Sequence, residues 1–554
     1  MSENLMVTRG VDRAAMFSSG QGDKTEESSH YDGLLVVRLW HAFLELDALP
    51  LGFIGSLAVL IGSLQDNSPF TSKVPGSWFF GVPTRPLTGN GFLELVSTWL
   101  IYCGMMLTIY VWVRLVLSIY RGERPTMGRL WGIFFLWVIP LMVAGPLLSR
   151  DVYSYAAQGE MVSLGISPYQ NGPSLLGQNP FIYAVDPIWS HAPAPYGPLF
   201  LAVASLFVNI SGHSVVGTVV LLRLTALLGV VAVGVYAPKI GELLGQPREG
   251  VFVLSALNPL SLYDLASAGH NDAWMLGLMM AGLYYALTHR TVLGIILISL
   301  AGAVKAPAFA ALAFVGYNWV QTPSFWPRLR WSIVALVVAG VVLAGLGVVT
   351  GLGLGWVKAL ATPGAVTLPA DPITALATTV HRVTSALGVP LSIHLYLSVM
   401  RILGLGLSGV VGLILVLRSN RQKLIRSLGI SLLVLVFFGP VVWPWYLVWA
   451  IAVLACSAGK YLTYAIVGIS IAAFPLSFPG GGQSIVSWIA YISALTLVGI
   501  AVAYRFEWLS HEHRLQVEEV LVRFQWMITD EFGVQRSLAN PSHLESTVSQ
   551  QSTR

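Results

Sequence analysis

The stretch LLSRDVYSYAAQGEM, residues 147–161, places carboxylates and tyrosines directly after an apolar run. In a helix, Tyr155 and Gln158 would share the face of Asp151, because they follow it by four and seven positions. Glu160 would point the opposite way. A carboxylate at the end of a membrane segment suits removal of a proton from an incoming hydroxyl group. Asp151 also suits a helix N-cap, where its oxygens would accept backbone N–H bonds, so both roles stay open.

A second polar stretch, SAGHNDAW at residues 267–274, joins two apolar segments. As an exposed turn that opens a helix, it would use Asn271 or Asp272 as the N-cap. As part of a site, His270 and Asp272 would bind sugar hydroxyls or a divalent cation. A metal site needs more ligands than this stretch supplies, so the interpretation as a cation site is the weaker one.

Two basic residues are candidates for binding an anion. Lys305 lies in the apolar run GAVKAPAFA, where burial of its charge requires a partner or an aqueous cavity. Snorkelling of the ammonium to the membrane interface is the alternative. Pro307 breaks the helix there and would let the ammonium reach a phosphate at the outer surface. Arg382 in TTVHRVTSALG could act in the same way, although simple solvation in a loop explains it equally well.

Aromatic residues cluster in GPVVWPWYLVW, residues 439–449, around a proline that separates two short apolar segments. Trp443, Trp445 and Tyr446 could belong to the aromatic belt found at membrane interfaces. The break in the chain also suits a stacking surface for a sugar or a groove wall for a lipid chain. Tyr196 in APAPYGPLF has a similar position, directly before an apolar run.

The composition indicates the elements that must position these side chains. The chain has 554 residues, of which 55% are hydrophobic and 10% charged, whereas soluble domains carry about 25% charge. Long continuous apolar segments favour an all-α polytopic membrane protein with about 13–14 transmembrane helices over a β-barrel. The net charge of +5 fits a cytoplasmic loop bias and does not indicate nucleic-acid binding. Both cysteines lie in apolar runs, so no disulfide framework is expected.

Basic residues between the apolar segments predict a cytoplasmic N-terminus. If the loops rich in basic residues lie in the cytoplasm, the expected domain organisation has three parts. These are a disordered cytoplasmic segment 1–46, a transmembrane catalytic domain 47–505 and a cytoplasmic tail 506–554. The loop 149–214 then lies outside, is poor in Lys and Arg, and carries the catalytic candidates. Within it, residues 196–210 are apolar but too short to span, which favours a re-entrant or interfacial segment.

The motifs SRDVYSYAAQGEM, GISPY, APYGPLF, NPLSLYDLASAGHNDAW, VKAP and WPWYL follow one another along the chain. Together they resemble the polyprenol-phosphate-mannose-dependent mannosyltransferases of bacterial envelopes, which belong to the GT-C class of membrane glycosyltransferases. The match is to the α-(1→6)-mannopyranosyltransferases that build the mannan backbone of lipomannan and lipoarabinomannan. The resemblance runs from about residue 90 to about residue 505.

This resemblance implies roles for individual residues. Asp151 occupies the position of the catalytic carboxylate, and Lys305 and Arg382 match the residues that contact the donor phosphate. Apart from the resemblance, the position of Arg150 next to Asp151 predicts that it tunes or orients this carboxylate. The aromatic residues would line the donor or acceptor groove. The expected substrate-binding residues are Tyr155, Gln158, Glu160, Tyr196, His270, Asn271, Asp272, Trp443, Trp445 and Tyr446.

The resemblance also implies the reaction and the partners. The donor is a polyprenyl phosphomannose, the acceptor is a lipid-anchored mannan, and the site lies at the exterior face of the plasma membrane among membrane lipids. Phosphate is a good leaving group when a cation stabilises its charge, so one carboxylate base suffices. Direct displacement from a β-linked donor would give an α-product by inversion. No metal is assigned to the site.

Two alternatives stay open from the residues alone. A lipid or solute transporter is favoured by broken helices and by the intramembrane residues Arg223 and Arg401. The long polar exterior loop and the lack of a convincing internal repeat speak against it. The second alternative is a transferase of the same class that uses a polyprenyl phosphate carrying arabinose or glucose, because the sequence pattern does not discriminate these donors.

Overall fold

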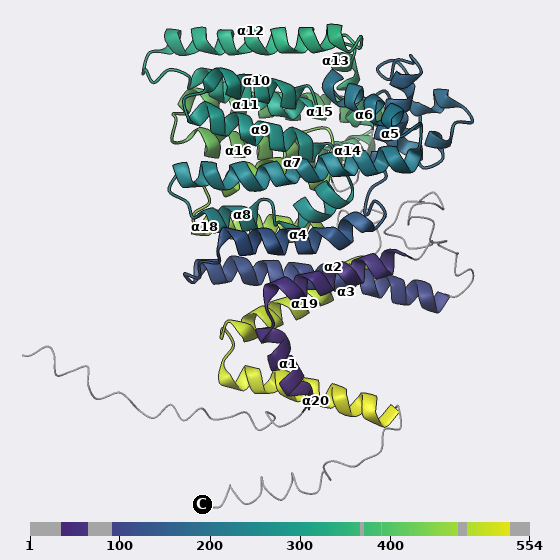
Figure 1. The fold of residues 1–554 in the computed structure, drawn as a ribbon, viewed down its shortest axis with the longest axis vertical. Coiled ribbons are helices and arrows are strands. Elements are labelled where there is room, and N and C mark those ends of the chain that lie inside the picture. Colours follow the sequence, from purple (N-terminus) through teal and green to yellow (C-terminus); the bar gives the residue numbers. More distant parts are fainter. Residues whose placement is uncertain (1–34, 65–90, 366–370, 389–390, 475–484, 532–554) are drawn as a thin grey trace, which may run out of the picture. The chain divides into compact units, whose positions relative to one another are not determined.

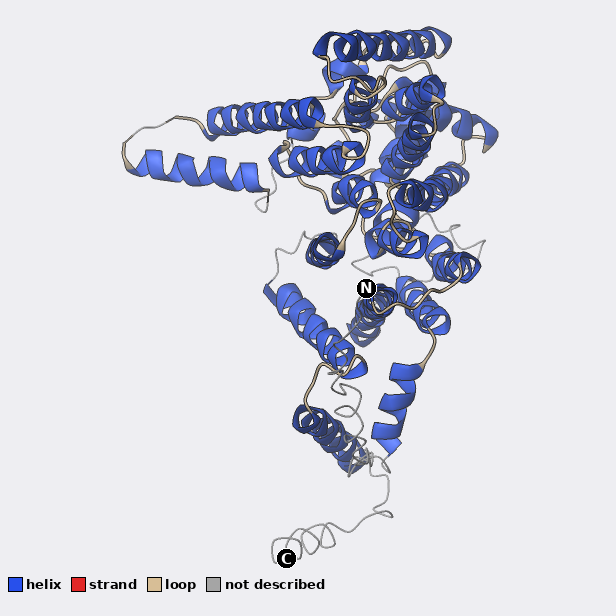
Figure 2. Ribbon diagram, turned by 90° about the vertical axis from the view of Figure 1, so that its left-hand side faces the viewer, coloured by secondary structure: helices blue, strands red, loops and turns tan. Residues whose placement is uncertain are grey.

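A computed structural model describes residues 35–64, 91–365, 371–388, 391–474 and 485–531. Every regular element in these ranges is a helix, which confirms the all-α class (Figure 2). Most of the expected disordered N-terminus, the exterior segments around 65–91 and 478–484 and the end of the C-terminal tail lie outside the described residues. From residue 35 the chain forms a helix, because the pattern LLVVRLWHAFLEL is apolar at helical spacing.

The chain divides into two compact units, residues 47–502 and a smaller one formed by residues 1–46 with 503–554. The smaller unit contains α1 (Leu35–Glu45) and α20 (His511–Glu531). The helices of the larger unit are α2 (Ala48–Ser63), α3 (Gly91–Tyr120), α4 (Met127–Val143), α5 (Asp151–Ser163), α6 (Pro198–Ile210), α7 (Val215–Leu243), α8 (Arg248–Leu254), α9 (Asp272–Leu287), α10 (Thr291–Gly302), α11 (Phe309–Tyr317), α12 (Phe325–Val349), α13 (Trp356–Ala359), α14 (Pro372–Ala386), α15 (Ile393–Arg418), α16 (Leu424–Phe438), α17 (Leu447–Ala455), α18 (Lys460–Ala473) and most of α19 (Ile485–Arg505).

Short helical turns connect these helices at several places. They are η1 (Pro173–Leu176), η2 (Pro180–Ile182), η3 (Pro187–Trp189), the π-helical η4 (Ser261–Ser267), η5 (Ala306–Ala308), η6 (Thr362–Ala365) and η7 (Pro444–Tyr446). The turns η5 and η7 confirm the breaks expected at KAP and at WPWY. In both turns a proline stands at the first or second position, where its missing N–H costs no hydrogen bond.

Four described helices are long and apolar enough to cross a membrane by themselves: the Val96–Tyr120 part of α3, α7, α12 and α15. The pair α1 and α2 passes the same criteria only when counted together, and the other apolar helices have 10–17 residues. The polytopic membrane class is therefore confirmed. The expected number of about 13–14 spans is reached only if many of the short apolar helices are also counted as spans. The apolar residues 196–210 form one of these short helices, α6.

The apolar residues 250–266, which the sequence predicts as one membrane span, do not form one continuous helix in the structure. The helix α8 ends at Leu254, and the chain resumes as the π-helix η4 at Ser261. The reason lies in the sequence Asn258–Pro259, because proline has no N–H to continue a helical ladder. The Asn258 side chain instead accepts the backbone N–H of Leu260 at 3.0 Å. The interruption makes the following SAGHNDAW segment part of the protein interior.

In Figure 1 the helices α12, α10, α9, α7, α4 and α3 follow one another from top to bottom, and α5 and α6 lie to the right of them. Small residues allow the close approach of α7 and α9. A Cβ atom on Gly229 would lie 2.3 Å from the carbonyl oxygen of Ala273, a distance that would force the two helices apart. This contact fixes the start of α9, which directly follows His270 and Asn271.

Arg223, in the first third of α7, is fully buried and ties together the segments that precede Asp151 and His270. Its guanidinium donates to the carbonyl oxygens of Leu141 and Ala144 at 2.8 Å and of Met142 at 3.1 Å. A further bond of 2.8 Å reaches the carbonyl of Ser267. The intramembrane arginine that favoured a transporter is therefore a bridge between α4 and η4.

We expect Arg223→Met to lower the thermal stability of the detergent-solubilised protein strongly. Four carbonyl groups, three of them buried, would lose a charged donor, and in the described part of the chain only that of Leu141 would keep a second donor, the Ser267 hydroxyl. Each buried group left unsatisfied costs about 1–3 kcal/mol. Thermal unfolding followed by tryptophan fluorescence measures the effect. Arg382→Met is the matched control, because Arg382 is exposed and its loss should leave Tm unchanged. Equal Tm values for Arg223→Met and the wild type would contradict the bridging role.

Candidate active site

The chain turns sharply between α4 and α5 and presents Asp151 as the first residue of α5. Leu148 in this turn has a φ of 67°, in the left-handed region that costs a non-glycine residue roughly 1–2 kcal/mol. Strain of this kind persists where the surrounding structure imposes it, often beside functional residues. The acidic side chain in the first turn also interacts favourably with the helix dipole. The turn therefore delivers a carboxylate to one end of the helix stack.

The Asp151 carboxylate is held by side chains from distant parts of the chain. Its Oδ1 accepts the indole N–H of Trp189 at 2.9 Å, and its Oδ2 lies 3.6 Å from Nδ1 of His270. The N-cap position belongs to Arg150, which makes no capping bond, so Asp151 is not the N-cap. The side chain is 13% exposed. Burial raises the pKa of Asp151 to about 6, against the opposing effects of Lys305 and of the Trp189 hydrogen bond.

Arg150 does not contact Asp151 through its guanidinium but holds the loop that carries Trp189. Its Nε donates to the carbonyl oxygen of Ala184 at 2.9 Å, and its Nη2 donates to that of Val185 at 3.1 Å. This loop connects η2 to η3, whose last residue is Trp189. Neighbouring residues of the chain, Arg150 and Asp151, thus bind the same loop and fix the indole against the carboxylate.

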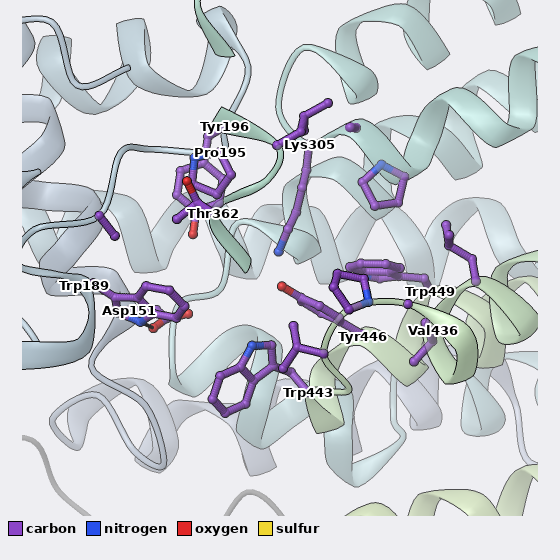
Figure 3. Close-up of a pocket in the computed structure, with 18 of the residues that line it drawn as sticks. Asp151, Trp189, Pro195, Tyr196, Lys305, Thr362, Val436, Trp443, Tyr446 and Trp449 are labelled. Carbon is purple, nitrogen blue, oxygen red and sulfur yellow. Dashed lines mark hydrogen bonds between the residues drawn. The ribbon is translucent and has the colours of Figure 1, made fainter. Parts of the chain in front are cut away.

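A cavity of about 400 Å³ opens beside Asp151. Figure 3 shows Asp151 and Trp189 on one side of it and Val436, Tyr446 and Trp449 on the other, with Lys305 reaching in between. The polar side includes Ser154 and Gln158 of α5. Apolar side chains of α15 and α16 and of the segments after α13 and α16 line much of the rest, namely Leu360, Leu405, Leu435, Val436, Pro440 and Val441.

Lys305 lies at the break between α10 and η5 and lines the cavity with its ammonium group. Its Nζ donates to both oxygens of Asp272 at 2.8 Å and lies 4.6 Å from the centre of the Tyr446 ring. Asp272 is fully buried and also accepts the indole N–H of Trp449 at 2.7 Å. The Asp272 carboxylate therefore accepts hydrogen bonds from both Lys305 and Trp449. Its bonds to Lys305 hold the ammonium group at the cavity wall.

His270 lies directly behind the cavity and is fully buried. The preceding Gly269 has a φ of +80°, and a Cβ there would come within 2.8 Å of the Arg223 side chain, so glycine is required. The imidazole stacks on Trp445 with the ring centres 3.9 Å apart. Burial, reinforced by the charge of Lys305, lowers the pKa of His270 well below its usual value, so the ring is neutral at pH 7.

The structure brings many of the residues singled out from the sequence to one place. Those that line the cavity are Asp151, Gln158, Tyr196, Lys305, Trp443 and Tyr446. Those packed against these residues are Tyr155, His270, Asp272 and Trp445. Asn271 is buried beside His270, and its side-chain amide has no partner in the described part of the chain.

Two of the expected residues do not reach the cavity. Glu160 binds Asn179 at 2.9 Å and His213 at 2.7 Å, so it anchors α5 to its surroundings. Arg382 is exposed on α14 and does not contribute to the cavity wall. Asp186, a further acidic residue of the loop 149–214, caps η3 by accepting the backbone N–H of Ile188.

Sequence reasoning missed Ser154, Trp189 and Trp449 as cavity residues. Ser154 follows Asp151 by three positions, so helical spacing alone could have identified it. Trp449 ends the aromatic stretch that was noted in the sequence, whereas no local pattern marks Trp189. Among the described residues, no group of three or more His, Cys, Asp or Glu side chains is arranged to hold a metal ion.

Fold and site together define a polytopic all-α membrane protein with a carboxylate and a buried lysine on the wall of one cavity. Comparison with known proteins gives the family. The family model described as "Alpha-(1->6)-mannopyranosyltransferase, N-terminal domain" matches residues 49–321, and the "MptB C-terminal domain" model matches residues 373–506. The first match contains both Asp151 and Lys305.

Curated relatives agree with these matches. The chain is 31% identical to alpha-(1->6)-mannopyranosyltransferase A of Mycobacterium tuberculosis over 472 residues, which cover 82% of this chain and 89% of the relative. It is 30% identical to alpha-(1->6)-mannopyranosyltransferase B of Corynebacterium glutamicum, over 74% of this chain and 73% of the relative. No solved structure gives a significant match. The chain belongs to the α-(1→6)-mannopyranosyltransferase family and is a GT-C type glycosyltransferase that transfers mannose. Family membership sets aside the transporter alternative.

Proposed function

We propose that the protein transfers mannose from a polyprenyl phosphomannose donor to a growing lipid-anchored α-(1→6)-mannan, with Asp151 as the general base. The observation that carries the proposal is the cavity itself. A carboxylate and an ammonium group lie on its wall, and the same cavity continues among apolar side chains of α15 and α16. A sugar phosphate with a long hydrocarbon tail has this distribution of polar and apolar surface.

The chemistry follows from the positions of these groups. The acceptor hydroxyl gives its proton to Asp151 as its oxygen attacks the anomeric carbon of the donor mannose. The bond from that carbon to the phosphate oxygen breaks, and polyprenyl phosphate leaves with its charge stabilised by Lys305. Attack opposite the leaving group converts a β-linked donor into an α-linked product. One base and one cation are sufficient for this displacement.

The exterior face of the plasma membrane is the proposed location of this site. Segments rich in Lys and Arg connect the apolar helices on the side away from the loop 149–214, and such segments remain in the cytoplasm. The donor lipid stays in the bilayer, and the apolar part of the cavity is formed partly by α15, one of the helices long enough to span. The sugar phosphate then meets the acceptor at the membrane surface.

The test is transfer by purified protein from radiolabelled polyprenyl phosphomannose to a short α-(1→6)-mannoside. We expect product whose new linkage is cleaved by acetolysis, which is selective for 1→6 bonds. GDP-mannose, donors with a shortened prenyl chain, and polyprenyl phosphates carrying arabinose or glucose serve as comparison donors. Efficient transfer from GDP-mannose without lipid donor would refute the proposed donor class. Preference for the arabinose or glucose lipid would refute the proposed sugar.

The pH dependence of kcat/KM should report Asp151, because the base must be ionised to act. The wild-type rate should fall as the pH drops through about 6. Trp189→Phe removes a hydrogen bond that stabilises the charged carboxylate, so the pKa of Asp151 should rise and the acid limb should move to higher pH. Trp443→Phe is the matched control, since Trp443 lines the same cavity without contacting Asp151. An acid limb that stays in place in Trp189→Phe would contradict this assignment.

A further inference from the structure

Two polar side chains on α5 line the cavity, and each carries a buried atom that has no hydrogen-bond partner among the described residues. Ser154 is 3% exposed and Gln158 is 4% exposed, and both line the cavity. The Ser154 Oγ and the Gln158 Oε1 have no hydrogen-bond partner among the described residues. A buried polar group without a partner costs free energy, so such groups in native proteins call for an explanation.

Other buried serines in helices of this protein behave differently from Ser154. Ser255 donates its hydroxyl to the carbonyl oxygen of Val251 at 2.6 Å, and Ser299 donates to that of Ile295 at 2.7 Å. This bond to the carbonyl four residues earlier is the usual local solution for a serine within a helix. Ser154 makes no such bond in the structure, and its hydroxyl remains available to a molecule in the cavity.

The spacing along α5 relates both groups to Asp151. Ser154 follows it by three residues and Gln158 by seven, which corresponds to about 4.5 Å and about 10.5 Å along the helix axis. Ser154 is thus within reach of the sugar ring whose hydroxyl contacts Asp151, and Gln158 is within reach of its far side or of the next ring. A hydroxyl that donates and accepts, and an amide oxygen that accepts, both match sugar hydroxyl groups.

The positions of Lys305 and Asp151 on the cavity wall indicate where the donor and the acceptor would bind. The phosphate of the donor requires a cation, and Lys305 is held in place by Asp272 on another part of the wall. The acceptor must contact Asp151, because its hydroxyl gives up the proton there. The polar groups that follow Asp151 on the same helix face therefore lie beside the acceptor.

We propose that Ser154 and Gln158 form the acceptor subsite, in which they bind hydroxyl groups of the α-mannoside that Asp151 activates. This inference rests on the proposed transfer reaction and assigns a part of its site. The subsite distinguishes the hydroxyl-rich acceptor from the lipid-linked donor, whose phosphate and tail are bound elsewhere in the cavity.

The experiment measures KM separately for donor and acceptor in Ser154→Ala, Gln158→Leu and the wild type. Each substitution should raise KM for the α-(1→6)-mannoside by roughly tenfold, the loss of one good hydrogen bond, while KM for the donor stays constant. Ser163→Ala is the control on the same helix, because the Ser163 hydroxyl binds Asn209 instead of lining the cavity. Monodeoxy mannosides complete the test. An acceptor that lacks the hydroxyl bound by Ser154 should be poor for the wild type and should lose nothing further in Ser154→Ala.

The outcomes are distinguishable from one another. Ser154→Ala should retain the wild-type Tm, because the substitution removes a hydroxyl that has no hydrogen-bond partner among the described residues. A lowered Tm together with equal losses for both substrates would show a structural role and overturn the inference. Unchanged acceptor KM values, or a rise in donor KM, would overturn it while the proposed function stands. Absence of transfer by the wild type would overturn the proposed function, and the acceptor subsite with it.

Discussion

Asp151→Asn is expected to abolish mannosyl transfer while the protein stays folded. The asparagine has nearly the same shape, and its amide oxygen can still accept the indole N–H of Trp189. It has no basic oxygen to take a proton from the acceptor. General-base catalysis contributes about 10²–10⁴-fold to a rate, so we expect a loss of that order. Transfer of radiolabelled mannose and the Tm in detergent, measured on the same preparation, test both parts of this prediction.

Glu160→Gln is the matched control, because Glu160 lies on the same helix and is buried like Asp151. Its carboxylate binds Asn179 and His213 away from the cavity, so its loss should lower Tm and leave the acid limb of the pH profile in place. Full activity of Asp151→Asn would remove Asp151 from the mechanism. The search for the base would then move to Glu160, Asp186 or Asp272. Their carboxylates are engaged by Asn179 and His213, by a helix cap and by an ion pair, respectively.

The part of the site that could be predicted is the part encoded locally. Helical spacing placed Gln158 on the face of Asp151, and the prolines in KAP and WPWY marked the breaks at η5 and η7. These features depend on residues within one or two helical turns. Local pattern therefore identified the segments that meet at the cavity and the breaks that allow them to meet.

The pairings between segments could not be predicted, because packing decides them. Lys305 and Asp272 were each expected to bind substrate, and the structure shows that they bind each other across 33 positions of the chain. Trp189 comes from the loop 149–214, in a part without hydrophobic periodicity, and reaches Asp151 across 38 positions. Arg382 was assigned from a segment without a distinctive motif, and it is exposed on α14.

Lys305→Met is expected to abolish transfer and also to destabilise the protein. Removing one partner of a buried ion pair leaves Asp272 uncompensated, which typically costs about 3–5 kcal/mol. Loss of activity in this variant alone would therefore not separate a role in catalysis from a role in folding. Transfer activity and Tm must be compared in a variant that removes the charge without leaving a buried carboxylate.

The double variant Lys305→Met/Asp272→Asn meets this requirement. An asparagine at position 272 can still accept the indole N–H of Trp449, and neither position then carries a charge, so Tm should recover toward the wild type. Activity should remain about 10²–10³-fold below the wild type, the usual effect of removing one group that stabilises developing charge. The donor phosphate would have no cation in the described cavity wall. If transfer recovers along with Tm, Lys305 serves only to neutralise Asp272, and the leaving phosphate must be stabilised by another group. If Tm recovers and transfer does not, the role of Asp272 is to keep a charged lysine in place for the donor.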